Sequence, residues 1–224
     1  IVCGVSCGLM YAVSKTVMLK GYEATSVAFM TLCHSAGMIV PCIIGHFLWS
    51  EKLSVLSIMG ILVTIFAITL LKDNRAATTK FKAKGIIFGL IIFLTSGGVM
   101  ISQKAMGVYF ETEGVSAYTL YSFIVPALIL SLLSKPKTIK NINLKDKKTI
   151  GFCALGSAIS LSVIGFVMTG LASSVPSVIL FPLFNGLGII AVCIGSVFAF
   201  KEKLSIKNVV GLLLGVCGLC LVNL

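Results

Sequence analysis

The chain has 224 residues, of which 58% are hydrophobic and 11% are charged, and its mean hydropathy is +1.10. A soluble domain carries about a quarter charged residues, so this chain cannot cover itself with a solvated surface. Its net charge of +11 is gathered in short loops between apolar runs, which is typical of a membrane orientation signal and argues against nucleic-acid binding.

Long charge-free runs follow one another along the whole sequence. Most match the roughly 20 apolar residues that a helix needs to cross a bilayer, and unbroken runs exclude the alternating pattern of a barrel strand. We therefore predict an all-α integral membrane protein with eight transmembrane helices. In chain order these are 1–19, 24–49, 54–72, 83–104, 114–134, 149–172, 175–200 and 206–224.

Local signals mark several of the predicted helix ends and bends. Ser54 is a suitable N-cap for the third helix, and Ser173-Ser174-Val175-Pro176 supplies a turn before the seventh, with Pro176 at its first position. Pro41 and Pro182 remove backbone donors inside the second and seventh helices, so each predicts a kink.

The distribution of basic residues predicts the orientation. With eight spans, 15 Lys/Arg fall on one face of the membrane, Lys52 and Lys104 on the other, and Lys15 inside a span. By the positive-inside rule the Lys-rich face is cytoplasmic and the C-terminus lies outside. We expect a multi-pass protein of the cell membrane, of the bacterial inner or plasma membrane type.

One octet occurs twice. Phe47–Ser54 returns as Phe198–Ser205, displaced by 151 residues, and the ungapped match of 26–71 to 177–222 has 15 identities in 46 positions. Long-period self-similarity indicates a duplicated structural unit. The identities include Glu51/Glu202, Ser26/Ser177, Gly37/Gly188, Cys42/Cys193 and Gly60/Gly211.

The number of spans between the copies predicts their orientation. Five predicted helices separate the octets, and an odd number of crossings makes two copies enter the membrane from opposite sides, as in the inverted repeats of secondary transporters. We assign 1–72 to the last three helices of a first repeat, 73–82 to a Lys/Arg-rich connector and 83–224 to a complete second repeat. Two further helices are expected before residue 1.

The Glu-Lys-Leu-Ser segment at a helix end, followed by a short run to Gly and an apolar helix, resembles the EamA-type transporters of the drug/metabolite transporter superfamily. The stretch Ser174–Gly188 is similar to the penultimate helix of that family. The resemblance implies a ten-helix bundle of two inverted five-helix repeats that carries metabolites, amino acids or drugs, with this chain as helices three to ten. Many members have both termini in the cytoplasm, whereas the charge bias here places the C-terminus outside.

Polar residues inside apolar spans are the candidates for a substrate site, because a polar group in lipid is costly without a role or a partner. His34 lies in the middle of the second span, and the 151-residue offset pairs it with Asn185 near the midplane. Interhelical packing is the alternative role for this pair. The predicted substrate-binding set consists of these two residues, their small neighbours and one weaker candidate, an amide inside the fourth span: His34, Asn185, Ser35, Gly37, Gly186, Gly188 and Gln103.

The acidic residues all fall in loops or at helix ends, so no carboxylate in these spans predicts a proton relay. Glu51 and Glu202 repeat, but their position at helix exits favours a structural corner that pairs locally with Lys. Three Gly-x3-Gly segments fit close helix packing and could equally mark a homodimer face.

The motifs of enzymes and of ATP-driven pumps do not occur in the sequence: there is no Walker loop, no His-Glu-x-x-His and no nucleophile elbow. We expect no cofactor and no metal, and we do not expect an enzyme. The leading prediction is a secondary transporter of small organic solutes that works by alternating access, with the solute and the lipid bilayer as its partners. A non-transporting membrane scaffold and an intramembrane enzyme acting on lipid-linked substrates are the alternatives.

Overall fold

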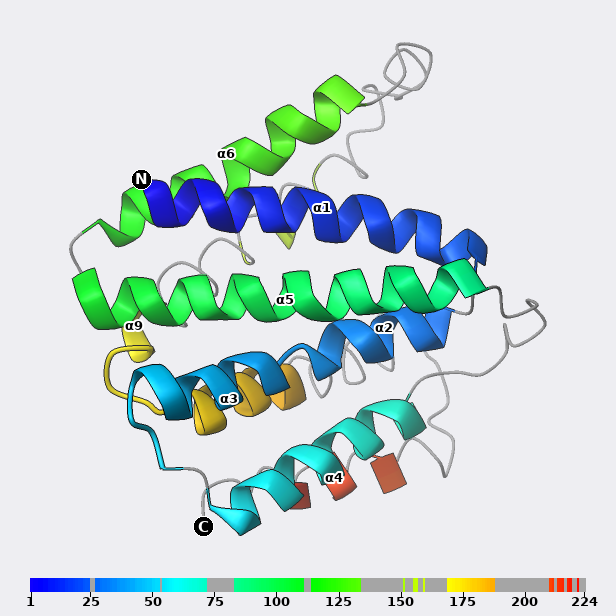
Figure 1. Ribbon diagram of the computed structural model, residues 1–224, viewed down its shortest axis with the longest axis vertical. Helices are drawn as coiled ribbons and strands as arrows, with labels where there is room; N and C mark the ends of the chain where they lie inside the picture. The colour runs from blue at the N-terminus through cyan, green and yellow to red at the C-terminus, as the bar shows by residue number, and fades with distance from the viewer. Residues whose placement is uncertain are drawn as a thin grey trace. The chain divides into compact units, whose positions relative to one another are not determined.

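The computed structural model describes residues 1–24, 27–52, 54–71, 83–110, 114–133 and 169–187, together with residues 151, 155, 156, 159, 210, 211, 213–215, 217, 218 and 221. The helices in chain order are α1 (Val2–Ala24), α2 (Val27–Ala36), α3 (Ile39–Leu48), α4 (Val55–Leu71), α5 (Ala83–Phe110), α6 (Val115–Leu133) and the short α9 (Thr169–Leu171), followed by a helix at Ser177–Leu187 (Figure 1). In this part of the chain the regular structure is helical, which confirms the predicted all-α class for the described residues.

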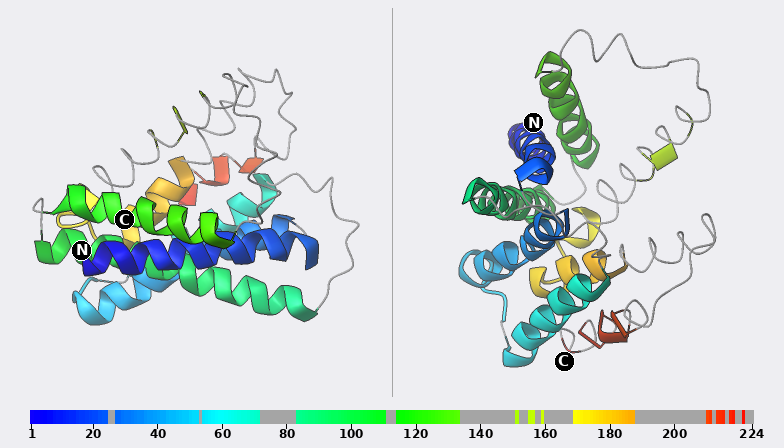
Figure 2. Two further views of the ribbon diagram at one scale, coloured as in Figure 1. Left: turned by 90° about the horizontal axis from the view of Figure 1, so that it is seen from above. Right: turned by 90° about the vertical axis from the view of Figure 1, so that its right-hand side faces the viewer.

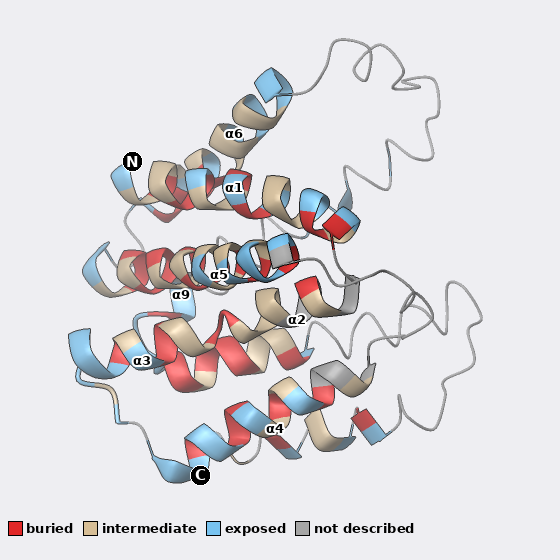
Figure 3. Ribbon diagram, turned by 45° about the vertical axis from the view of Figure 1, so that its right-hand side comes forward, coloured by how far each residue is buried: buried red, intermediate tan, exposed pale blue. Residues whose placement is uncertain are grey.

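Within the described part of the chain, three helices are long and apolar enough to cross a membrane: Val2–Ala24, Lys84–Phe110 and Val115–Leu133. The helices also carry exposed large apolar residues, for example Leu62 of α4 and Ile87 of α5, both 58% exposed. Exposed and buried residues alternate along the helices (Figure 3). Exposed apolar rows of this kind suit a helix that faces lipid rather than water.

The second predicted span consists of two helices rather than one. α2 ends at Ala36, a turn occupies Gly37 and Met38, and α3 begins at Ile39. Pro41 explains the position of the break, because a proline ring clashes with the carbonyl four residues earlier, which here belongs to Gly37. The Gly37 carbonyl instead accepts a hydrogen bond from the amide of Val40, three residues later, at 3.1 Å. The predicted kink is confirmed, one turn before the proline itself.

Other helix ends differ from the prediction by a few residues. α5 was expected to end at Lys104 but continues to Phe110, so Lys104 lies inside a helix with only 3% of its surface exposed. The expected helix end at Lys104 is therefore six residues too early. The N-cap prediction for α4 is confirmed, since the Ser57 amide donates to Ser54 Oγ at 3.1 Å. The turn predicted at 173–176 is also present, and the next helix begins at Ser177.

The chain divides into two compact units, which are described separately. The first comprises Ile1–Thr16 and Ser102–Ser174, and the second comprises Val17–Ile101 and Val175–Leu224. Each unit draws residues from both predicted repeats.

In the first unit the start of α1 runs beside α6 (Figure 2). A Cβ placed on Gly4 would lie 2.8 Å from the Tyr118 carbonyl oxygen, and one on Gly8 would lie 2.8 Å from Val125 Cβ. The Gly-x3-Gly segment thus serves close approach of two helices, one of the two roles predicted for it.

In the second unit α5 packs against α2 and α3 through small residues. A Cβ on Gly89 would lie 2.8 Å from Phe29 of α2, and a Cβ on Gly97 would lie 2.5 Å from Val40 of α3. α3 in turn lies beside the helix Ser177–Leu187, where Cys42 Sγ is 3.8 Å from the Ser177 carbonyl oxygen (Figure 1).

α4 crosses the helical residues near the C-terminus within the same unit. A Cβ on Gly218 would lie 2.5 Å from Thr64 Oγ1, and a Cβ on Gly215 would lie 3.8 Å from Ala67 Cβ. Because the residue number rises along α4 while it falls along the partner, the two helices run in opposite directions where they cross.

Candidate functional site

His34 lies in the last turn of α2, directly before the break in the second predicted span. Its residue is half-buried, and its backbone carbonyl accepts a hydrogen bond from Ser96 Oγ of α5 at 3.0 Å. Gly37 and Met38 interrupt the helix, so the His34 carbonyl lacks its regular helical donor. The hydroxyl of Ser96 on α5 supplies a hydrogen bond to this carbonyl in its place. The surroundings of His34 therefore combine an interrupted helix with a polar residue from a neighbouring helix.

Gly37 has a packing role in this region. A Cβ at this position would collide with Ser96 Oγ and would lie 3.0 Å from the Gly97 amide nitrogen. The space beside Gly37 is therefore filled by α5. Ser35, half-buried in the last turn of α2, lies next to this contact.

Asn185 and Gly186 lie in the last turns of the helix Ser177–Leu187. The Asn185 amide donates to the carbonyl of Phe181 on its own helix at 3.0 Å, its residue is half-buried, and Gly186 is buried. Gly188 lies outside the described residues. Gln103, the remaining predicted site residue, is 2% exposed and belongs to the first unit, whereas His34 and Asn185 belong to the second. Their role in substrate binding stays a prediction.

A polar contact between the two predicted repeats joins Glu51 to Ser177. The Ser177 amide donates to Glu51 Oε2 at 2.8 Å, and Ser177 Oγ donates to Glu51 Oε1 at 3.3 Å. Ser177 is the first residue of its helix, so the carboxylate satisfies an amide that has no partner within the helix and lies at the positive end of the helix dipole. Glu51 thus caps a helix 126 residues away in the sequence.

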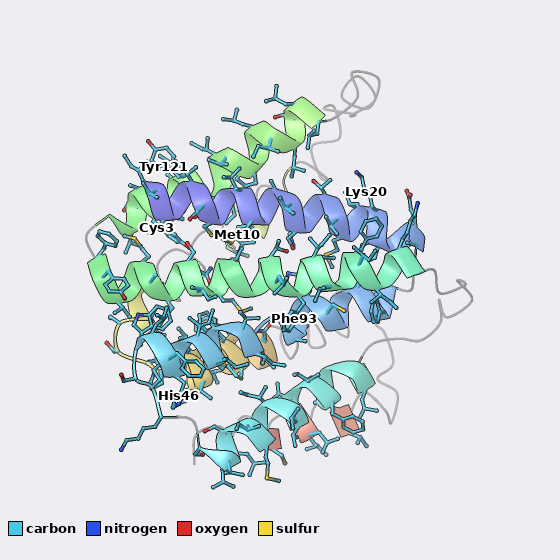
Figure 4. The ribbon with its side chains drawn as sticks, in the orientation of Figure 1. Cys3, Met10, Lys20, His46, Phe93 and Tyr121 are labelled. Atoms are coloured by element: carbon cyan, nitrogen blue, oxygen red, sulfur yellow. The ribbon has the colours of Figure 1, made fainter. Side chains whose placement is uncertain are left out.

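The end of α3 holds the Glu51 side chain in place. Ser50 adopts a left-handed backbone conformation with φ of 52°, which turns the chain back after Trp49. The Gly45 carbonyl accepts from the amides of Trp49 and Glu51 at 3.0 and 3.2 Å, and His46 Nδ1 lies 2.8 Å from the Glu51 carbonyl oxygen. Figure 4 labels His46 at this end of α3.

Gly45 makes room for the carboxylate. A Cβ at this position would lie 2.5 Å from Glu51 Oε2 and 3.1 Å from Ser177 Oγ. The sequence predicted a structural corner at Glu51, but it did not identify Ser177 as a partner of both carboxylate oxygens. The identity of Ser177 in the repeat was the one signal that could have drawn attention to it.

The first unit contains a second buried polar cluster, which the sequence indicated only weakly. Ser102 Oγ donates to the Cys3 carbonyl at 3.0 Å, and the Tyr118 hydroxyl lies 3.5 Å from Ser102 Oγ. Tyr118 is 1% exposed, and Ser122 Oγ donates to its carbonyl at 2.8 Å. Three helices, α1, α5 and α6, therefore meet through hydroxyl groups. The consecutive polar residues Ser102, Gln103 and Lys104 in an apolar helix were the available signal.

The chain was compared with models of protein families and with curated protein sequences, and neither comparison finds a match. The resemblance to EamA-type transporters rests on the residues of this sequence alone.

Proposed function

We propose that this protein is a secondary transporter of the EamA type, which moves small organic solutes across the cell membrane by alternating access. Its two inverted repeats would be 1–72 and 83–224, in a bundle of ten helices of which this chain supplies eight. The solutes would be metabolites, amino acids or drugs.

The crossing of α4 with the C-terminal helical residues is the observation that supports this proposal most directly. The 151-residue offset makes Thr64 equivalent to Gly215 and Ala67 equivalent to Gly218. If each residue is replaced by its equivalent in the other copy, the pair Thr64–Gly218 becomes the pair Gly215–Ala67. Both pairs are in contact. Reciprocal contacts of this kind are what a two-fold axis produces. Inverted repeats in secondary transporters are related by such an axis in the membrane plane.

Half-buried polar residues in apolar helices give the proposal its candidate site. His34 and Asn185 are equivalent under the same offset, and each lies close to small residues, including Ser35, Gly186 and Gly188. The break between α2 and α3 begins three residues after His34, at Gly37, and secondary transporters form their sites at interrupted helices near the midplane.

Solute counterflow into liposomes tests the proposal. The full-length protein is reconstituted and assayed with a panel of radiolabelled amino acids and a fluorescent cationic dye. We expect at least one probe to exchange, and we expect His34→Ala and Asn185→Ala to lower the rate, with the lipid-side Ser131→Ala as the matched control. Movement of no solute would contradict transport. Exchange that both alanine variants leave unchanged would remove this pair from the mechanism.

A further inference from the structure

The backbone hydrogen bonds change their spacing where α2 gives way to α3. Through this break they span three residues instead of four. The amide of Met38 binds the carbonyl of Ser35 at 3.2 Å. The amide of Val40 binds the carbonyl of Gly37 at 3.1 Å. A stretch of 3₁₀ geometry inside a helical span often marks a functional hinge.

Ser96 connects α5 to this break. It is 5% exposed, and its Oγ lies 3.0 Å from the His34 carbonyl oxygen and 3.2 Å from the carbonyl oxygen of Phe93 on its own helix. Figure 4 labels Phe93 on α5. A serine hydroxyl has one proton, so it donates to one of these carbonyls at a time. If the His34 carbonyl moves away, the Phe93 carbonyl keeps the buried hydroxyl satisfied, and no donor is left unpaired.

Glycines bring the break and α5 together at the same level. A Cβ on Gly37 would collide with Ser96 Oγ, and a Cβ on Gly97 would lie 2.9 Å from the Gly37 carbonyl oxygen. Glycine weakens a helix interior, so a glycine on each side of this contact favours a role for the close approach itself. The approach lets the Ser96 hydroxyl reach a backbone carbonyl of the neighbouring helix.

We propose that the break is a hinge and that Ser96 closes it. Donation to the His34 carbonyl holds the end of α2 against α5 and fixes the backbone that carries the His34 side chain, whereas donation to Phe93 lets α3 move away from α5. Ser96 is then a positioning residue for His34. The part of His34 in solute binding rests on the proposed function, and the hinge does not.

The hydrogen bonds at the break suit two populated states. The His34 carbonyl also accepts from the Gly37 amide at 3.3 Å, so it keeps a donor when Ser96 turns to Phe93. One hydrogen bond between neutral groups changes an equilibrium about fivefold once the competing bonds are counted. An effect of this size biases two states without locking either of them.

Distances between spin labels test the hinge without a known solute. The full-length protein, with its native cysteines replaced, carries labels at the exposed positions Phe47 of α3 and Leu94 of α5. It is measured in lipid nanodiscs by pulsed electron paramagnetic resonance. We expect Ser96→Ala to raise the ratio of the longer to the shorter distance about fivefold. Gly37→Ala should also raise it, because the new Cβ collides with Ser96 Oγ.

Thr95→Ala is the matched control. Thr95 precedes Ser96 on α5, and its hydroxyl donates to the Ile91 carbonyl of the same helix at 2.8 Å, so its loss should leave the distances unchanged. Equal distance distributions in the wild-type protein, Ser96→Ala and Gly37→Ala would show a rigid break and overturn the hinge. The same shift in Thr95→Ala as in Ser96→Ala would show a general loosening of α5 and would overturn it as well.

Solute exchange tests the positioning of His34. We expect Ser96→Ala to raise the KM of a transported solute about fivefold and to have no further effect on the KM in a His34→Ala background, because Ser96 acts through His34. An equal rise in both backgrounds would overturn the positioning role. A longer distance in a protein that moves no solute would refute transport and keep the hinge, whereas transport with unchanged distances would refute the hinge alone.

Discussion

Gly45→Ala measures how much the Glu51–Ser177 contact stabilises the fold. The new Cβ would lie 2.5 Å from Glu51 Oε2, which is closer than the two atoms can approach. The carboxylate is the far end of a flexible side chain, so it moves and the backbone stays. The movement breaks the two hydrogen bonds from Ser177, and the helix Ser177–Leu187 loses its N-terminal acceptor.

The expected magnitude is a difference between two opposing effects. Loss of a side-chain cap costs about 1 kcal/mol, and loss of the second hydrogen bond costs about 0.5 kcal/mol at a half-exposed site. Alanine in place of glycine inside a helix stabilises by about 0.5–1 kcal/mol. The net destabilisation is about 0.5–1 kcal/mol, which lowers the melting temperature of a chain of this size by about 2 °C.

The same substitution in a Glu51→Ala background should have the opposite sign. Without the carboxylate the nearest oxygen to the Cβ is Ser177 Oγ at 3.1 Å, and this hydroxyl can rotate away on its own side chain. The gain in helix propensity then dominates, so Gly45→Ala should raise the melting temperature by about 2 °C. The four proteins of this double-mutant cycle are compared by fluorescence-detected thermal shift in one detergent, with Gly156→Ala, whose Cβ meets nothing within 4 Å, as the control. Equal effects of Gly45→Ala in both backgrounds would refute the reasoning.

Three further outcomes follow from local geometry and charge. Ser54→Ala removes the cap of α4 and should cost about 1 kcal/mol, whereas Ser54→Gly should cost only a few tenths, so equal thermal shifts would contradict a capping role. Gly8→Ala forces a Cβ within 2.8 Å of Val125 in the packed contact of α1 with α6, and the yield of monodisperse protein should fall sharply while Gly151→Ala, with open space around it, leaves the yield unchanged. A reporter fused after Leu224 should read extracellular, and a cytoplasmic signal would contradict the orientation taken from the Lys-rich loops.

Features that depend on neighbouring residues could be predicted from the sequence. Ser54 caps its own helix, and Pro41 interrupts the helical turn before it. Gly4 and Gly8 allow α1 to approach α6 closely, as their spacing predicts. Ser54 and Pro41 act within about one turn of their own helix, and the spacing of Gly4 and Gly8 is itself a local pattern, so the residue types carry the information.

Features that depend on a distant partner could not be predicted in the same way. Nothing near Glu51 in the sequence indicates that its carboxylate reaches a residue 126 positions away. The charge of Lys104 predicts a helix boundary there, because charge commonly ends a span, yet α5 continues past it to Phe110 and Lys104 is buried. The meeting of Ser102 with Tyr118 requires three helices to be packed before it exists. The substrate site itself, centred on His34 and Asn185, remains a prediction from the repeat.

The inverted relation of the two repeats is tested most directly by the sidedness of equivalent residues. Single cysteines are placed at Lys52 and Lys203 in a background whose eight native cysteines are replaced, and intact cells are treated with a membrane-impermeant maleimide. Inverted repeats require the two positions to lie on opposite faces, so the cysteine at 52 should react from outside, and the cysteine at 203 should react only after the membrane is opened. Labelling of both positions from the same side would contradict the account.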